Sequence, residues 1–158
     1  MLCPDCGAEI PKGTEECCEC NARIIKTALD ILEEVLLLRS QGKLKEALNR
    51  IEQALALEPF NAEILYTCGS LLEDKGDSNA ALLYYDRALE ASPAHAPTLV
   101  AKGSILRDSG DIGSALSLFD AAIASDPRFA IAYNAKGYLY QKQGSYEQAL
   151  RCYSMAQE

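Results

Sequence analysis

The residues of this chain whose types and spacing best suit chemistry are cysteines near its beginning. Seven cysteines occur in 158 residues, and five of them fall within the first twenty positions. Cys3 and Cys6 form one C-x-x-C pair, and Cys17 and Cys20 form a second. Two such pairs supply four thiolates, the donor set of a tetrahedral zinc site. The spacing therefore predicts one metal ion bound by these four sulfurs.

The segment 1–26 resembles a short zinc ribbon, which implies a small module stabilised by metal. Gly7 and Asn21 follow the two pairs, where a residue that tolerates the left-handed conformation lets the chain bend around the ion. Few apolar residues surround the cysteines, so we expect the metal to supply most of the folding free energy, on the order of 10 kcal/mol. Iron is an alternative to zinc, because a rubredoxin-like site presents the same ligands. Cys18 fits neither pair and is an alternative ligand to Cys17.

Two other functions stay open for this module. If oxidation released the metal and freed Cys17, Cys18 and Cys20, the segment would be a redox- or metal-responsive switch. Zinc ribbons also contact nucleic acid, but that requires clustered Lys or Arg. This segment is acidic and belongs to a chain with a net charge of -8. We therefore expect no nucleic-acid binding and keep a nucleic-acid-associated role as the weaker alternative.

The remainder of the chain repeats itself with a period of 34 residues. Each repeat has a glycine, an alanine five positions later and, in the first three repeats, a proline at the boundary: Gly42, Gly76, Gly110 and Gly144; Ala47, Ala81, Ala115 and Ala149; Pro59, Pro93 and Pro127. Apolar residues at helical spacing flank each glycine, which predicts two helices in each repeat. A strict repeat of this length indicates a stack of similar helix pairs.

Local signals predict where these helices begin and end. Gly76 follows the first helix of its repeat, where a positive φ ends the helix, and Asp77 or Ser78 can cap the second helix. Asp111 and Ser145 are expected to repeat that cap. Close approach of two backbones is expected where small residues of the first helices face small residues of the second helices, namely Gly69, Gly103 and Gly137 opposite Ala81, Ala115 and Ala149.

This pattern resembles the tetratricopeptide repeat from residue 28 to residue 158. Its small, aromatic, alanine and proline signature positions are filled by Gly69, Tyr85, Ala88 and Pro93, then by Gly103, Phe119, Ala122 and Pro127, and lastly by Gly137, Tyr153 and Ala156. The resemblance implies an all-α fold, a right-handed α-solenoid of four helix-turn-helix repeats that follows the zinc ribbon. The solenoid domain is expected to span 27–158, with repeats at 28–61, 62–95, 96–129 and 130–158. The first repeat departs from the pattern at Val35, Lys43 and Ile51, as is typical of a terminal repeat.

The resemblance also implies a concave groove lined by the first helices, which binds a partner. It places these side chains there: Leu32, Leu36, Glu63, Tyr66, Ser70, Glu73, Asp74, Val100, Ser104, Arg107, Asn134 and Tyr138. Apolar and aromatic groups are mixed with acids that outnumber the bases, so we expect a protein or peptide partner that is apolar or basic. An acidic C-terminal segment is not expected, because other residues occupy the positions of the chaperone-binding carboxylate clamp: Leu32, Leu36, Thr67, Pro97 and Ala101.

Nothing in the sequence predicts an enzyme. His95 is the only histidine, and we expect it to be a solvated loop residue between Pro93 and Pro97. There is no glycine-rich phosphate loop and no nucleophile motif. No apolar run approaches the length of a membrane span, and the first residues do not form a signal segment. We therefore expect a cytoplasmic adaptor or scaffold that does not bind membranes.

The ends of the stack need cover, because a solenoid exposes apolar surface at its terminal repeats. Leu55, Leu89 and Ile123 recur where the next repeat should pack, and Gln157 takes that position in the last repeat. Exposure of Leu150, Tyr153 and Met155 would favour self-association or a further segment at this end. At the other end, Ile24 and Ile25 are expected to dock the ribbon onto the first repeat.

The first testable prediction concerns the metal. Cys6→Ser should abolish binding of one zinc ion per chain, because a tetrahedral site loses one of its four ligands. The helical circular dichroism should barely change, since the repeats have a core of their own. Metal analysis of the purified variant measures the first effect, and collapse of the helical signal would contradict the separation of the two modules.

Overall fold

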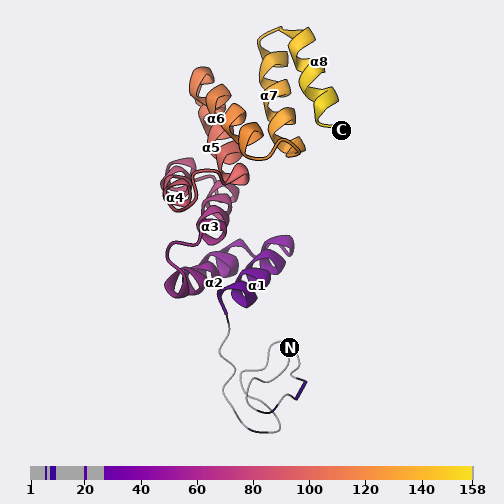
Figure 1. Ribbon diagram of the computed structural model, residues 1–158. Helices are drawn as coiled ribbons and strands as arrows, with labels where there is room; N and C mark the ends of the chain where they lie inside the picture. Colours follow the sequence, from indigo (N-terminus) through magenta and orange to yellow (C-terminus); the bar gives the residue numbers. More distant parts are fainter. Residues whose placement is uncertain (1–5, 7, 10–19, 21–26, 158) are drawn as a thin grey trace.

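The structure is a computed structural model that describes residues 6, 8, 9, 20 and 27–157. Between 27 and 157 every regular element is an α-helix. The helices are α1 (Ala28–Ser40), α2 (Leu44–Leu57), α3 (Ala62–Asp74), α4 (Ser78–Ala91), α5 (Ala96–Asp108), α6 (Ile112–Ser125), α7 (Ala130–Lys142) and α8 (Tyr146–Met155). They pack in consecutive pairs, and the four pairs follow one another along an elongated stack (Figure 1).

A glycine with positive φ ends the first helix of every pair. Gly76, with φ 85°, donates its N–H to the Glu73 carbonyl at 2.8 Å, and Asp77 donates to the Leu72 carbonyl at 2.9 Å. These two bonds satisfy carbonyls that the end of α3 leaves without helical partners. The predicted end of the helix at Gly76 is confirmed.

The predicted caps of the second helices are confirmed at two of three positions. Asp77 accepts a hydrogen bond from Ala80 N at 3.1 Å, and Asp111 accepts one from Ser114 N at 3.1 Å. Ser145 stands at the N-cap of α8 but makes no side-chain capping bond, so the prediction is wrong there.

The close contact inside each pair joins a glycine to an aromatic ring. A Cβ added to Gly69 would lie 2.4 Å from Cε1 of Tyr85, and one added to Gly103 would lie 2.6 Å from Cε1 of Phe119. Gly137 has the same relation to the ring of Tyr153, at 2.8 Å. The nearest atoms at these glycines thus belong to aromatic rings, a contact that the sequence did not predict, while the expected alanine partners Ala81, Ala115 and Ala149 are buried in the same helix pairs. The long side chain from the second helix reaches across and covers the glycine with its ring.

The first pair reaches the same closeness with different side chains. Val35 stands at the glycine position and Ile51 at the aromatic position, and both are buried, at 0% and 2% exposure. They belong to one apolar cluster that also includes Ile64 and Leu71 from the next pair. A larger residue on the first helix is thus matched by a smaller one on the second, which conserves the packed volume.

Successive pairs are joined by apolar side chains of the second helices. Leu89 and Ile123 are half-buried and pack against the buried cluster of α5, α6 and α7. At the C-terminal end, Leu150 is 68% exposed and Met155 46% exposed, whereas Tyr153 is half-buried. The predicted docking of Ile24 and Ile25 lies outside the described residues.

The glycine–ring contact generates a stability prediction. Gly103→Ala should lower the free energy of unfolding by about 1–3 kcal/mol, because its Cβ would overlap the Phe119 ring. Gly113→Ala is the matched control. The nearest atom to its added Cβ is 4.0 Å away, so that variant should gain about 0.5 kcal/mol from better helix propensity.

Urea unfolding followed by circular dichroism measures both variants. Combining Gly103→Ala with Phe119→Leu should restore part of the loss, since a smaller side chain frees the space. Equal stabilities of Gly103→Ala and Gly113→Ala would contradict the contact.

Candidate functional site

The first helices of the pairs form the candidate site. α3 contacts α5, and α5 contacts α7, so equivalent side chains of successive repeats lie near one another. Of the twelve predicted groove residues, three are buried and are closed to a partner: Leu32, Ser70 and Val100. The others are half-buried or exposed: Leu36, Glu63, Tyr66, Glu73, Asp74, Ser104, Arg107, Asn134 and Tyr138.

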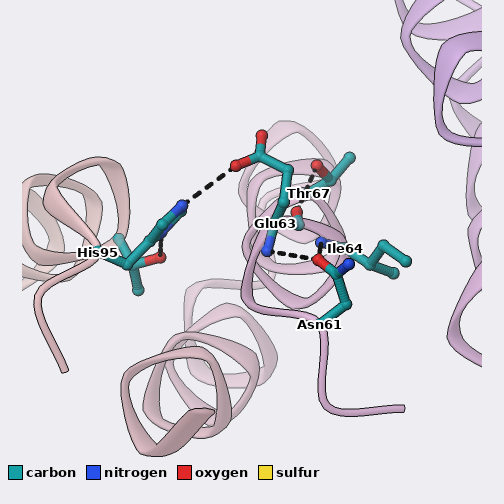
Figure 2. A network of polar contacts seen from close by, with 6 residues as sticks. Asn61, Glu63, Ile64, Thr67 and His95 are labelled. Atoms are coloured by element: carbon teal, nitrogen blue, oxygen red, sulfur yellow. Dashed lines mark hydrogen bonds and ion pairs between the residues drawn. The ribbon is translucent and has the colours of Figure 1, made fainter. Parts of the chain in front are cut away.

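A polar network joins the second and third repeats at the beginning of their first helices. Asn61 caps α3 by accepting hydrogen bonds from Glu63 N at 3.0 Å and Ile64 N at 3.3 Å (Figure 2). Across the gap to α5, His95 Nε2 lies 3.1 Å from Glu63 Oε2. The other ring nitrogen, Nδ1, lies 2.6 Å from Thr98 Oγ1. The network fixes the Glu63 carboxylate at the edge of the candidate groove.

His95 is therefore not the solvated loop residue that the sequence predicted. Its side chain is only 18% exposed, and it occupies the N-cap position of α5. Helix α3 supplies its surroundings, since the ring packs edge-on against Tyr66 with 5.7 Å between ring centres. One signal could have revealed this position, because Asn61 lies one period earlier and caps α3.

Tyr66 is the central aromatic residue of the second repeat. Its ring stacks on that of Tyr85, with 6.0 Å between centres, and the hydroxyl has no hydrogen-bond partner among residues 27–157. Burial raises the pKa of Tyr66, and the charges of Glu63 and Glu73 raise it further, while that of Arg39 lowers it. Tyr66 thus offers a partner both a half-buried ring and a hydroxyl able to form a hydrogen bond.

The ring that covers Gly69 also bonds to the groove. Tyr85 donates its hydroxyl proton to Glu73 Oε2. Burial, followed by this hydrogen bond, raises the pKa of Tyr85 well above its usual range. In the fourth repeat Tyr153 donates in the same way to Gln141 at 2.8 Å. Tyr85 therefore connects the packed interior, through its ring, with the acidic edge of the groove, through its hydroxyl group.

A bidentate ion pair joins the groove positions of the first two repeats. Arg39 Nε and Nη2 donate to Asp74 Oδ2 at 2.6 Å and Oδ1 at 3.1 Å. Together with Glu63 and Glu73, Asp74 makes this half of the site acidic, with Arg39 as the facing base. His95, which bonds to Glu63, was not among the predicted groove residues.

A separate hollow of about 840 Å³ lies beside the turn between α1 and α2. Leu44, Leu48 and Leu72 contribute to its lining, and none of the predicted groove residues does. The candidate site is thus an open face formed by side chains of successive first helices.

The predicted metal ligands lie mostly outside the described residues. Cys6 and Cys20 are described and exposed, whereas Cys3 and Cys17 are not described. Within the described part of the chain, no three metal-ligating side chains come together. The four-thiolate site therefore stays a prediction.

The two cysteines of the repeats are packing residues. Cys68 is buried in the first apolar cluster, and burial raises its pKa to about 12. Burial also raises the pKa of the half-buried Cys152. A thiol with a raised pKa is a poor nucleophile and metal ligand at neutral pH.

Comparison with known proteins supports this architecture. The family model described as "Tetratricopeptide repeat" matches residues 32–96 and 100–158. No match is found among curated proteins. Within residues 27–157, none of the helices combines the length and apolar character that a membrane span requires.

Several solved structures are similar. MamA residues 41 to the end, from Desulfovibrio magneticus RS-1, has a TM-score of 0.66 at 26% identity over 82% of this chain and 73% of that one. YrrB, described as a TPR protein with an unusual peptide-binding site, has a TM-score of 0.64 at 27% identity over 82% and 66%. PilF of Pseudomonas aeruginosa, with a TM-score of 0.74 at 16% identity over 82% and 59%, shows similarity of fold.

The Tyr85–Glu73 bond generates a prediction about pH. Near pH 7, Tyr85→Phe should lower the free energy of unfolding by about 1 kcal/mol, the usual net value of such a bond. Above about pH 10 the tyrosines of the unfolded chain lose their protons, while the raised pKa keeps folded Tyr85 protonated. The folded state then holds the extra proton, so wild-type stability falls as the pH rises. The Tyr85→Phe variant lacks this contribution. The difference in the free energy of unfolding between wild type and variant should therefore narrow as the pH rises.

Urea unfolding between neutral and alkaline pH measures this narrowing. Tyr146→Phe, at a side chain that is 67% exposed, is the matched control and should leave stability near pH 7 unchanged. A constant gap between Tyr85→Phe and wild type across the range would show that the hydroxyl does not titrate as expected.

Proposed function

Because the chain belongs to the tetratricopeptide repeat family, we propose that it is a non-catalytic adaptor whose first helices bind an extended segment of a partner protein. The observation that supports this most strongly is the row of accessible side chains on those helices. Leu36 is 48% exposed and Tyr138 41% exposed, and between them Tyr66 is half-buried with an unbonded hydroxyl. Accessible apolar and aromatic side chains on one face favour binding of another protein.

The charges of the first two repeats favour an apolar or basic segment. Glu63, Glu73 and Asp74 line α3, and Arg39 is the base that faces them. A lysine or arginine of the partner would find carboxylates already held by His95 and by the Tyr85 hydroxyl. An acidic segment would meet repulsion at this end of the groove.

The surroundings of the only histidine support an adaptor over an enzyme. Both ring nitrogens of His95 have neighbours within 3.1 Å, Glu63 and Thr98, at the junction between two repeats. These contacts give the side chain a structural role in positioning α5. YrrB, which is 27% identical, is described as having a peptide-binding site, in agreement with the proposed class of function.

The adaptor includes a metal-stabilised module at its N-terminal end. We place one zinc ion, with iron as the alternative, on Cys3, Cys6, Cys17 and Cys20. A set of four thiols fits either metal, and its two described members, Cys6 and Cys20, are exposed. The proposed location is the cytoplasm, where thiols stay reduced.

The test uses dodecapeptides selected by phage display on the immobilised chain. Tyr66→Ala combined with Asp74→Lys should weaken the selected peptides by about tenfold, because it removes an aromatic contact and reverses a groove charge. Glu90→Lys, at an exposed residue of α4, makes the same charge change away from the groove and should leave affinity unchanged. Circular dichroism checks that both variants fold. Equal losses of peptide affinity in the two variants would show that the peptides bind outside the groove.

A further inference from the structure

The third and fourth repeats hold two cations around one accessible aromatic ring. Tyr138, on α7, is 41% exposed. The guanidinium carbon of Arg107, on α5, lies 5.0 Å from the centre of its ring. Lys142 Nζ, one turn further along α7, lies 5.4 Å from the same centre. We call Arg107, Tyr138 and Lys142 the cationic subsite.

The positive charge of this subsite is only partly balanced. Arg107 Nε donates to Asp108 Oδ1 at 2.8 Å, and the Asp108 side chain is 70% exposed. Among residues 27–157, no other carboxylate is bonded to Arg107, and Lys142 has neither an ion pair nor a hydrogen bond from its ammonium group. Two cations close to one ring repel each other, so an anion placed between them would be stabilised.

In the first two repeats, the positions equivalent to Arg107 and Lys142 hold residues of opposite charge. Two periods separate Arg39 from Arg107, and two periods separate Asp74 from Lys142. Arg39 binds Asp74 through two hydrogen bonds of 2.6 and 3.1 Å. One period after Asp74 the residue is still an aspartate, Asp108, and two periods after it the residue is Lys142. The residue that stands toward Arg107 as Asp74 stands toward Arg39 is thus a second cation, and Arg107 keeps a single bond to the exposed Asp108.

We propose that the cationic subsite binds the carboxylate of an acidic side chain in the partner segment, an inference that rests on the proposed function. Arg107 donates hydrogen bonds to the carboxylate from its terminal guanidinium nitrogens, since Nε is bonded to Asp108, and Lys142 adds a second positive charge. The Tyr138 ring packs against the methylene groups of the acidic side chain. None of the three residues stands at a position of the C-terminal carboxylate clamp, so the ligand is a side chain within the segment.

The two halves of the groove then have opposite charge preferences. α3 carries the acidic residues and α7 carries Tyr138 and Lys142, with α5 between them. Packed helices lie about 8–10 Å apart, so the two halves are separated by roughly 16–20 Å. An extended chain advances about 3.3 Å per residue. The partner segment should therefore have a basic and an acidic residue separated by about five or six positions.

The test uses the dodecapeptides selected on the wild-type chain and made synthetically with a C-terminal amide. Lys142→Asp should rebuild the Arg39–Asp74 pair at Arg107 and occupy the subsite from within. It should weaken peptides that contain an acidic residue by about tenfold or more, and thermal unfolding should occur at the wild-type temperature or above it. Arg151→Asp, at a side chain that is 77% exposed on α8, makes the same charge change outside the groove and should leave affinity unchanged.

A peptide in which the acidic residue is changed to lysine should bind Lys142→Asp at least as well as it binds wild type. Two results would overturn the subsite without contradicting the adaptor function. One is that the selected peptides require Tyr66 but contain no acidic residue, and the other is that Lys142→Asp does not change their affinity. Binding that requires a free C-terminal carboxylate in place of the amide would also overturn it. Failure to select any peptide would overturn the adaptor and the subsite together.

Discussion

The contact between a glycine and an aromatic ring is the constraint on which the rest of this structure depends. At Gly69, Gly103 and Gly137 the ring of the second helix lies so close that a Cβ would overlap it. Such a contact permits one separation and one rotation of the two helices, since any shift opens a gap or produces a clash. Because three repeats share it, their helix pairs have the same internal geometry, and side chains one period apart occupy equivalent places.

This equivalence sets the pattern of ion pairs between repeats. Lys102 Nζ lies 2.5 Å from Asp86 Oδ1, and one period later Lys136 bonds to Asp120. In each pair the second helix of one repeat holds the first helix of the next. These pairs are partly exposed and therefore add little stability, about 1 kcal/mol at most. They help to fix the position of each first helix relative to the preceding repeat, and this aligns the groove side chains of successive repeats.

The sequence was sufficient for most features whose determining interactions are local, although the cap at Ser145 was not formed. The turn at Gly76 and the cap at Asp77 depend on neighbouring residues, so their types and spacing were enough to predict them. The contact of Gly69 with the Tyr85 ring was not predicted, because it depends on how far that side chain reaches across the helix pair. The burial of His95 was not predicted because its surroundings come from Glu63 and Tyr66 on α3, about thirty residues earlier in the chain.

The same reasoning explains why the chemistry of the groove could be predicted only as a mixture. A repeat fixes where a side chain stands, but each position is free to carry any charge that its neighbours tolerate. At one such place Arg39 faces Asp74 and the charge is cancelled inside the chain. Two periods later Arg107 and Lys142 stand in the same relation, with Tyr138 between them. Equivalent positions thus hold a neutral pair in one half of the groove, where Glu63 and Glu73 leave an acidic balance, and two cations in the other half. This difference in charge would give a bound segment a direction.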